Sequence, residues 1–298
     1  MLDLTALKSI IEAYGEALDQ PVRTLEIGGR VFDFNKRRGL MGVINLSEDS
    51  GYRERICRTG PEAIARGIEL AAQGADLVDI GVESTLPHAR KVDPAGQIER
   101  LIPVVQALAG RGIAVSAESY YPEVLEAAGQ AGARVFNLTG SREEAAVLRL
   151  AHRFEAAVIL CYVQGETVRD VRDFVFGEDT LAHMEADFRK RTERAAALGV
   201  HRCILDPGLG FYYRNLEDGA LRVNHQIKTF LQTFRLARLG YPILNILPHA
   251  PEIFGDEDRR AAEPFFAVLA LLGGTHIIRT HELSTVAKIR QVMEGFGG

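Results

Sequence analysis

Short apolar runs alternate with helical patterns along most of the chain. Eight runs rich in β-branched residues have the length of strands that are buried on both faces. They begin at Met41, Ala75, Ile113, Ala133, Ala156, Arg202, Tyr241 and Thr275. Between them the periodicity predicts helices that end at a glycine, two of which also have a proline near their start. These helices cover Gly60–Gly74, Pro122–Gly132, Glu185–Gly199 and Gln226–Gly240.

The alternation of strands and helices predicts an α/β protein built from parallel βαβ units. Eight such units in a chain of this length predict a single (β/α)8 TIM barrel, and a doubly wound open sheet is the alternative because periodicity does not show closure. Before the first strand, residues 1–20 predict an amphipathic helix, and Arg23–Phe34 predicts a short hairpin that turns at Gly28-Gly29. We expect one structural domain, in which residues 1–39 cap the bottom of the barrel and residues 40–298 form it.

The composition excludes several classes of protein. The chain has 298 residues, of which 47% are hydrophobic and 25% charged, and a net charge of −5, so we expect a soluble protein with no nucleic-acid or membrane partner. Its three widely spaced cysteines favour a reducing compartment over a disulfide framework. The acidic N-terminal segment is not typical of a signal peptide, and the longest apolar run, Phe265–Leu272, is too short for a membrane span. We therefore expect a cytoplasmic location.

Polar residues follow nearly every predicted strand, at the end where such barrels carry their chemistry. A lone Asp or Asn there is more often a cap or a turn residue, but a ring of them on one face predicts a functional site. Glu118, Asn137 and Asp206 can accept and donate hydrogen bonds along the edge of a flat polar heterocycle. Arg279 and His281 are two residues apart, share one face of a strand and suit an anion such as a phosphate.

Metal signals are weaker in this sequence. It contains no HExxH motif and no paired Cys/His spacing, and it lacks a glycine-rich phosphate loop. Asn45 and Asp49 can hold a Mg²⁺ ion that also contacts a substrate phosphate, since Mg²⁺ takes few protein ligands and keeps waters.

Six motifs in order resemble the strand-end motifs of the dihydropteroate synthase family. They read "INLSEDS", "DIGVESTLPHA", "SAESYYPEV", "FNLTG", "ILDPGLGF" and "IIRTHE", and they extend from about Ile44 to Glu282. The resemblance implies a pterin-binding TIM barrel and a transferase activity in folate biosynthesis. In the implied reaction, p-aminobenzoate is joined to 6-hydroxymethyl-7,8-dihydropterin diphosphate, and diphosphate is released. The family also implies a Mg²⁺ cofactor and a homodimer formed through the late helices.

The resemblance assigns roles to residues that match its motifs. Asn45 matches the asparagine that meets Mg²⁺ and diphosphate, and Arg279 and His281 match the pair that holds the diphosphate. The resemblance implies that the residues at the ends of the middle strands, and one phenylalanine, bind the pterin; these are Glu118, Asn137, Cys161, Asp206 and Phe211. The acceptor side is implied for second-loop residues and for the end of strand seven, namely Thr85, Pro87 and His249.

Departures from the family pattern fall mostly on the acceptor side. Glu118 stands where the family has aspartate, and Leu86 where the second loop has arginine. The first loop lacks the family's proline and phenylalanine, and the segment Leu247–Gly255 offers no lysine and only His249 as a basic residue. The leading interpretation is a dihydropteroate synthase-type transferase with weak activity or an altered acceptor. The alternatives are a non-catalytic or altered-specificity pterin-binding paralogue and a pterin-dependent methyltransferase domain, which would not need Arg279 and His281 as an anchor for diphosphate.

Overall fold

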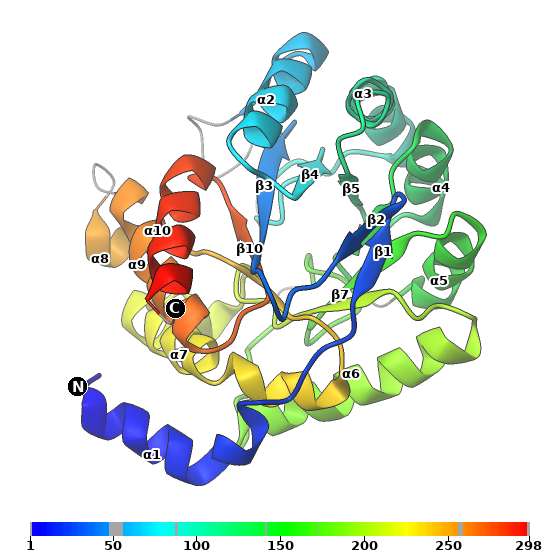
Figure 1. Cartoon of the computed structure of the whole chain (residues 1–298). Coiled ribbons are helices and arrows are strands. Elements are labelled where there is room, and N and C mark those ends of the chain that lie inside the picture. Colours follow the sequence, from blue (N-terminus) through cyan, green and yellow to red (C-terminus); the bar gives the residue numbers. More distant parts are fainter. Residues whose placement is uncertain are drawn as a thin grey trace.

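The core of the computed structural model is a ring of eight parallel strands (Figure 1). The structure describes residues 2–47, 56–86, 89–140, 142–170, 172–255 and 259–296. In space the strands follow the order β8-β7-β6-β5-β4-β3-β10-β9, and a parallel bridge between Leu205 and Ile243 joins the two ends of this series. The (β/α)8 barrel is therefore confirmed over the open sheet. The strands are β3 Gly39–Asn45, β4 Leu77–Gly81, β5 Val115–Glu118, β6 Val135–Leu138, β7 Ala157–Cys161, β8 Cys203–Asp206, β9 Leu244–Ile246 and β10 Ile277–Thr280.

Helices surround the ring and cover its outer face (Figure 1). Several begin at a side-chain cap; for example, the hydroxyl of Thr59 accepts a hydrogen bond from the backbone N–H of Glu62 at the start of α2. The helices that follow the first barrel strand are α2 Gly60–Ala72, α3 Pro94–Ala109, α4 Pro122–Ala131, α5 Glu144–Arg153, α6 Thr180–Ala197, α7 Gly219–Leu231, α8 Pro251–Phe254, α9 Arg259–Leu272 and α10 Leu283–Gly295, with short 3-10 helices η3 Arg214–Leu216 and η4 Thr233–Leu239.

Two predicted helices have different limits in the structure. The helix α6 begins before Glu185 because the carboxylate of Asp179 caps it by accepting from the backbone N–H of Ala182. A single helix over Gln226–Gly240 is wrong: α7 ends at Leu231, and the backbone then tightens into η4. The reason is that the backbone N–H of Phe234 donates to the carbonyl of Gly273 rather than continuing the helical ladder.

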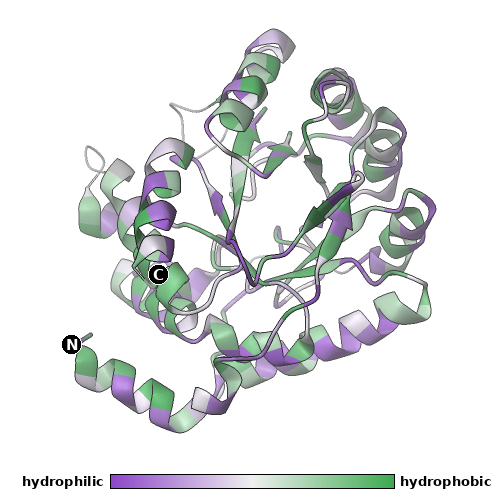
Figure 2. Cartoon of the chain, in the orientation of Figure 1, coloured by the Kyte–Doolittle hydropathy of each residue, from purple (hydrophilic) through white to green (hydrophobic). Residues whose placement is uncertain are grey.

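Alternating side chains on the strands form two apolar layers. One layer lies between the strands and the surrounding helices and contains residues such as Val78, Phe136 and Leu160. The other lies inside the ring and contains Leu77 and Ile159, among others. Figure 2 shows the strands as mainly hydrophobic and the helices as mixed, which is the pattern expected when only one helix face is buried. Inside the ring, the apolar residues give way to polar ones at the carboxyl ends of the strands.

A two-stranded hairpin closes the amino end of the ring. Its strands, β1 Leu25–Ile27 and β2 Arg30–Phe32, are antiparallel and turn at Gly28-Gly29, where both glycines have positive φ angles of 57° and 77°. The hairpin buries apolar side chains against the inner layer, which confirms it as the cap; these are Leu25, Ile27, Phe32 and Phe34. The helix α1 Leu4–Tyr14 lies at the periphery (Figure 1), and the 3-10 helix η1 Gly15–Ala17 joins it to η4.

Within the described residues, the structure contains no helix that is both long and apolar enough to cross a membrane. The division into residues 1–39 and 40–298 stays a prediction.

Candidate active site at the barrel mouth

A hydrogen-bonded chain of polar side chains lies inside the ring at the carboxyl ends of its strands. The side-chain amide of Asn137 on β6 donates to Asp79 Oδ2 on β4 at 3.0 Å. The thiol of Cys161 on β7 lies 3.5 Å from Asn137 Oδ1 and 3.4 Å from Asp206 Oδ2 on β8. Asp206 Oδ1 accepts the backbone N–H of Gly208 at 2.8 Å. Four strands thus contribute one continuous network of acceptors and donors.

Arg279 on β10 joins this network from the opposite side of the ring. Its Nε donates to Asp79 Oδ2, and one terminal nitrogen donates to Glu118 Oε2 on β5, both at 2.8 Å. The side chain is only 12% exposed. Burial opposes its charge, but the carboxylates of Asp79 and Glu118 outweigh burial and raise the pKa of Arg279. A buried guanidinium therefore holds two carboxylates that would otherwise repel each other.

Burial raises the pKa of two carboxyl groups of this site, Glu118 and Asp206. Burial raises the pKa of Glu118 to about 7, against the attraction of Arg279 and with the repulsion of Asp79 and Asp206. Burial likewise raises the pKa of Asp206 to about 6, against the hydrogen bond from the backbone of Gly208. Such shifts are common where a protein keeps acidic groups for a ligand. The site therefore suits a ligand that presents N–H donors to several acceptors.

Two buried oxygen atoms of the ring lack a partner among the described residues. They are Asp79 Oδ1 and Ser116 Oγ, which lie on neighbouring strands in direct register. An unpaired buried acceptor costs free energy unless a ligand or water satisfies it. The ring of Phe211, which follows β8, packs against the inner apolar layer beside Gly208. An aromatic face thus lies next to the polar edge.

A second cluster lies at the rim where β9 and β10 end. His249 Nε2 is 3.0 Å from Glu263 Oε1, and His281 Nδ1 is 3.1 Å from the same oxygen. The other ring nitrogen of His281 lies 3.3 Å from the side-chain nitrogen of Asn45, at the end of β3. Burial lowers the pKa of His281, although Glu263 opposes that shift. The cluster thus connects the α9 helix to the end of β3.

The loop after β4 is held by an arginine from a distant segment. The guanidinium of Arg169 donates to the backbone carbonyls of Ser84, Leu86 and Ala89, and it lies 3.5 Å from the carboxylate of Glu83. The hydroxyl of Tyr120 also donates to Glu83, at 2.5 Å. Thr85 and Glu118 line the same small hollow beside this loop. The loop is therefore tied down next to the polar ring.

The sequence and the fold both match known pterin-binding proteins. The family model described as "Pterin binding enzyme" matches residues 41–281. A dihydropteroate synthase from Synechocystis is 30% identical over 283 residues, which cover 91% of this chain and 94% of that protein. The chain belongs to the dihydropteroate synthase family. It is a transferase of the dihydropteroate synthase type.

Solved structures of the dihydropteroate synthase family share the barrel. The dihydropteroate synthase of Xanthomonas albilineans with 4-aminobenzoic acid has a TM-score of 0.78 and 28% identity, covering 93% of this chain and 99% of that one. The enzyme of Thermus thermophilus in complex with 6HMPPP has a TM-score of 0.72 and 27% identity, covering 92% of this chain and 99% of that one. The similarity therefore extends over nearly the whole chain.

The Mg²⁺ ion that the family implies has a limited set of donors here. Asn45 offers one neutral amide beside His281, and the other ligand considered from the sequence, Asp49, lies outside the described residues. Mg²⁺ commonly takes one or two protein ligands and completes its shell with waters and substrate phosphates. The described residues therefore fit an ion held mainly by a diphosphate, with Asn45 as one ligand.

The structure brings most of the predicted site residues together. Glu118, Asn137, Cys161 and Asp206 belong to the polar ring, with Phe211 beside it. Arg279 lies inside this ring, where it pairs with Asp79 and Glu118, and its role as an anion ligand stays a prediction, as do the roles of the other site residues. Pro87 lies outside the described residues.

Sequence reasoning assigned no role to three residues that the structure places in these networks. Asp79 lies within an ordinary strand pattern. Its spacing of two residues from Leu77, which belongs to the inner apolar layer, places it on the inward face of β4. Glu263 is the only carboxylate in the sequence of α9, and an acidic residue within an apolar helix is a detectable signal. Arg169 had no signal, because its contacts are with residues about eighty positions away.

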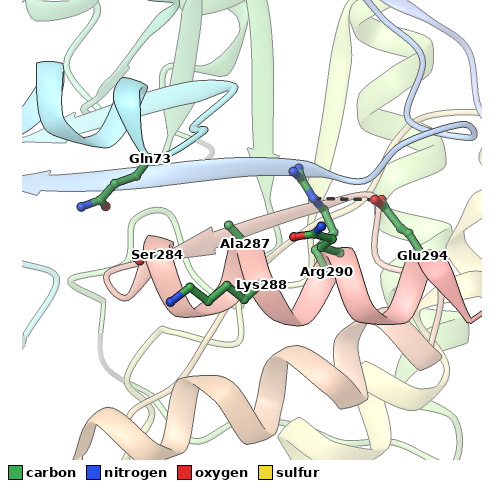
Figure 3. Close-up of a pocket in the computed structure, with 7 residues that line it drawn as sticks. Gln73, Ser284, Ala287, Lys288, Arg290 and Glu294 are labelled. Atoms are coloured by element: carbon green, nitrogen blue, oxygen red, sulfur yellow. Dashed lines mark ion pairs between the residues drawn. The ribbon is translucent and has the colours of Figure 1, made fainter.

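A separate surface hollow lies along α10 and the end of α2, lined by Gln73, Lys288 and Arg290, among others (Figure 3). The guanidinium of Arg290 forms ion pairs with Glu294 at 3.8 Å and with Asp76 at 3.6 Å. This hollow is on the outside of the barrel and takes no part in the networks described above.

Proposed function

We propose that the chain transfers the pterin-methylene group of a dihydropterin diphosphate to an arylamine such as p-aminobenzoate. The observation that carries this proposal is the buried ring formed by Asp79, Glu118, Asn137 and Asp206. A 2-amino-4-oxo pteridine has neighbouring N–H groups on one edge, and a carboxylate accepts such groups in pairs. Membership of the dihydropteroate synthase family supports the same substrate class.

The pterin edge is proposed to face Asp206 and Asn137, with Glu118 as a further acceptor. The unpaired oxygen of Asp79 supports this placement, because a donor on the ligand would satisfy it. Cys161 lies between Asn137 and Asp206, and burial raises the pKa of its thiol, so it stays a neutral neighbour of the ring. Phe211 offers an apolar face for the bicycle.

The diphosphate end is proposed to face Asn45, His281 and Arg279. Mg²⁺, when it is bound with Asn45 as one ligand, would neutralise part of the charge on the diphosphate. His281 is oriented by Glu263, which fixes one ring nitrogen and leaves the other toward Asn45. The hydrogen bonds of Arg279 to the two carboxylates use its Nε and one terminal nitrogen, and its other terminal nitrogen is proposed to donate to the diphosphate.

The chemistry requires one bond to form and one to break. The arylamine nitrogen attacks the methylene carbon of the pterin, the bond between that carbon and the diphosphate oxygen breaks, and its electron pair leaves with diphosphate. The amine loses one proton to solvent. Fixed positive charge at the leaving group stabilises the transition state, so loss of these cations lowers the rate more than it lowers pterin affinity.

The acceptor side is proposed to include Thr85, Pro87 and His249. Leu86 replaces the arginine of the family pattern, and the donors of Arg169 are taken by backbone carbonyls of the loop. His249 is hydrogen-bonded to Glu263. These features support either a weak affinity for p-aminobenzoate or the use of a different arylamine as acceptor.

A turnover assay tests the proposal. Diphosphate release is followed with dihydropterin diphosphate, Mg²⁺ and a panel of arylamines, for the wild type, Asp206→Asn and the matched exposed control Asp19→Asn. Release that depends on an arylamine, is retained in Asp19→Asn and is lost in Asp206→Asn supports the transferase. Tight pterin binding without release for any acceptor would instead support the non-catalytic paralogue.

We also propose a homodimer formed through the late helices. Apolar side chains are exposed on three of these helices, namely Ile253 at 55% on α8, Leu272 at 54% on α9 and Val292 at 71% on α10. Burial of these side chains against a second copy of the chain would favour association. Light scattering tests the stoichiometry. A cytoplasmic location and the absence of nucleic-acid and membrane partners stay predictions.

A further inference from the structure

The cluster of His249, Glu263 and His281 combines three metal-ligating side chains from three elements. His249 lies in the segment between β9 and α8, Glu263 on α9, and His281 between β10 and α10. Their ligand atoms all lie within 4.8 Å of one another. Glu263 is fully buried and His281 nearly so, and the side chain of His249 is 24% exposed. The cluster is thus enclosed except at His249.

We propose that His249, Glu263 and His281 bind a first-row divalent cation of the Zn²⁺ type. Both imidazole nitrogens converge on one oxygen, Glu263 Oε1, at 3.0 and 3.1 Å. Two ligands that lie about 2.1 Å from a tetrahedral metal are about 3.4 Å apart. Each nitrogen is therefore within about 0.4 Å of the spacing from the carboxylate oxygen that a shared ion requires.

The second oxygen of Glu263 is held by the turn that follows β10. Oε2 accepts the backbone N–H groups of His281 at 3.0 Å and Glu282 at 3.2 Å, and it also accepts the hydroxyl of Thr280. One oxygen is thus fixed while the other faces the histidines, which is how outer contacts orient a monodentate carboxylate ligand.

The charge of Glu263 also favours a cation. Glu263 is fully buried, and one of its oxygens lies within 3.1 Å of both histidine nitrogens. Among the described residues, its ion pairs are with these two histidines only. A buried carboxylate without a permanent cation is costly, and a divalent ion would supply that charge.

His281 has support on its other ring nitrogen as well. A metal on Nδ1 leaves the proton on Nε2, which lies 3.3 Å from the amide of Asn45. A half-turn of that amide would bring its oxygen to accept the proton. Metal-bound histidines commonly have such a partner, and it fixes the ring orientation.

The ligand types select the class of metal. Two imidazoles and one carboxylate suit Zn²⁺, Fe²⁺ or Co²⁺, whereas Mg²⁺ prefers oxygen ligands and water. Three protein ligands leave at least one coordination position for a water or a substrate oxygen. If the proposed function holds, the substrate group nearest to this rim is the diphosphate, and the ion would replace cations that the family pattern has and this chain lacks.

Metal content of the full-length protein tests the site without any pterin or turnover. Protein stripped with a chelator is dialysed against Zn²⁺ in the presence of excess Mg²⁺, and bound zinc is measured by mass spectrometry. We expect one Zn²⁺ per chain in the wild type, and at least a tenfold weaker affinity in His249→Ala and Glu263→Gln, because outer contacts alone cost about 10–100-fold. The exposed histidine variant His201→Ala serves as the matched control and should bind normally.

Co²⁺ provides a second readout of the same site. The bound ion should give visible absorption bands that are lost in His249→Ala, a variant at a partly exposed position whose fold is checked by circular dichroism. The proposal is wrong if the wild type binds no stoichiometric Zn²⁺ or Co²⁺, in which case the cluster is a hydrogen-bonded relay. It is equally wrong if His249→Ala binds these ions as tightly as the wild type does. Neither result depends on whether the transferase reaction occurs.

Discussion

Replacing Glu118 by glutamine tests the proposed hydrogen bond between this side chain and the pterin. The substitution keeps the size of the side chain and removes its charge. In the structure, Glu118 Oε2 accepts from Arg279 at 2.8 Å, and Oε1 accepts no hydrogen bond from the described residues. We infer that Oε1 serves a donor on the pterin. The amide of Glu118→Gln has only one oxygen, which can accept a hydrogen bond from Arg279 or from the pterin. Its nitrogen, which is a donor, would then face the donor of the other partner, and that hydrogen bond is lost.

The expected loss of pterin affinity in Glu118→Gln follows from the charge and the pKa of the Glu118 carboxyl group. A hydrogen bond to an ionised group contributes about 1.5–3 kcal/mol, so pterin affinity should fall by about that amount at pH 8, where Glu118 is ionised. Because the pKa of Glu118 is raised to about 7, the group is mostly protonated at pH 6. The wild type must then release a proton to accept the ligand, which costs about 1.4 kcal/mol. The difference between wild type and Glu118→Gln should therefore shrink by about 1.4 kcal/mol between pH 8 and pH 6.

Calorimetric titration with free 6-hydroxymethyl-7,8-dihydropterin measures this difference without the diphosphate. The exposed variant Glu123→Gln on α4 is the matched control and should bind as the wild type does. Equal affinity of wild type and Glu118→Gln at pH 8 would refute the role of Glu118. A loss that stays the same at pH 6 and pH 8 would refute the reasoning from its ionisation.

Three further predictions concern the neighbours of this ring. Arg279→Ala leaves two buried carboxylates unpaired and should lower the free energy of unfolding by about 3–5 kcal/mol, measured in urea against an exposed Arg153→Ala control; a change below about 1 kcal/mol would contradict the ion-pair argument. Arg169→Ala removes the contacts that hold the loop after β4 and should raise the KM for the arylamine more than that for the pterin, whereas equal changes would count against it. Sulfonamides should inhibit weakly because Leu86 replaces an arginine, and Leu86→Arg should strengthen inhibition; strong inhibition of the wild type would disprove this.

The sequence was sufficient to predict the barrel and several members of its polar ring, although not Asp79. Alternating residues on parallel strands face one side, so Asn137, Asp206 and Arg279 could be placed at one mouth before any contact was known. The hairpin cap followed from the Gly28-Gly29 turn in the same way. These features depend on local periodicity, which a single chain records directly.

The partners of these residues could not be predicted from local patterns. The ion pairs of Arg279 with Asp79 and Glu118 join three strands, and spacing along the chain does not record that the guanidinium lies between these two carboxylates. The contact between Glu263 and His249 depends on how α9 packs over the strand ends, and spacing along the chain does not record that packing. The break between α7 and η4 likewise results from a long-range hydrogen bond from Phe234 to Gly273.

The most direct test of the central claim is a crystal structure of the protein with 6-hydroxymethyl-7,8-dihydropterin. We expect the pterin bicycle to lie inside the barrel mouth, with its amino and ring N–H groups within hydrogen-bond distance of Asp206 and Glu118. Its carbonyl oxygen should lie at the side-chain amide of Asn137. A pterin bound outside the ring of strands, or Asp206 and Glu118 both turned away from it, would contradict the account.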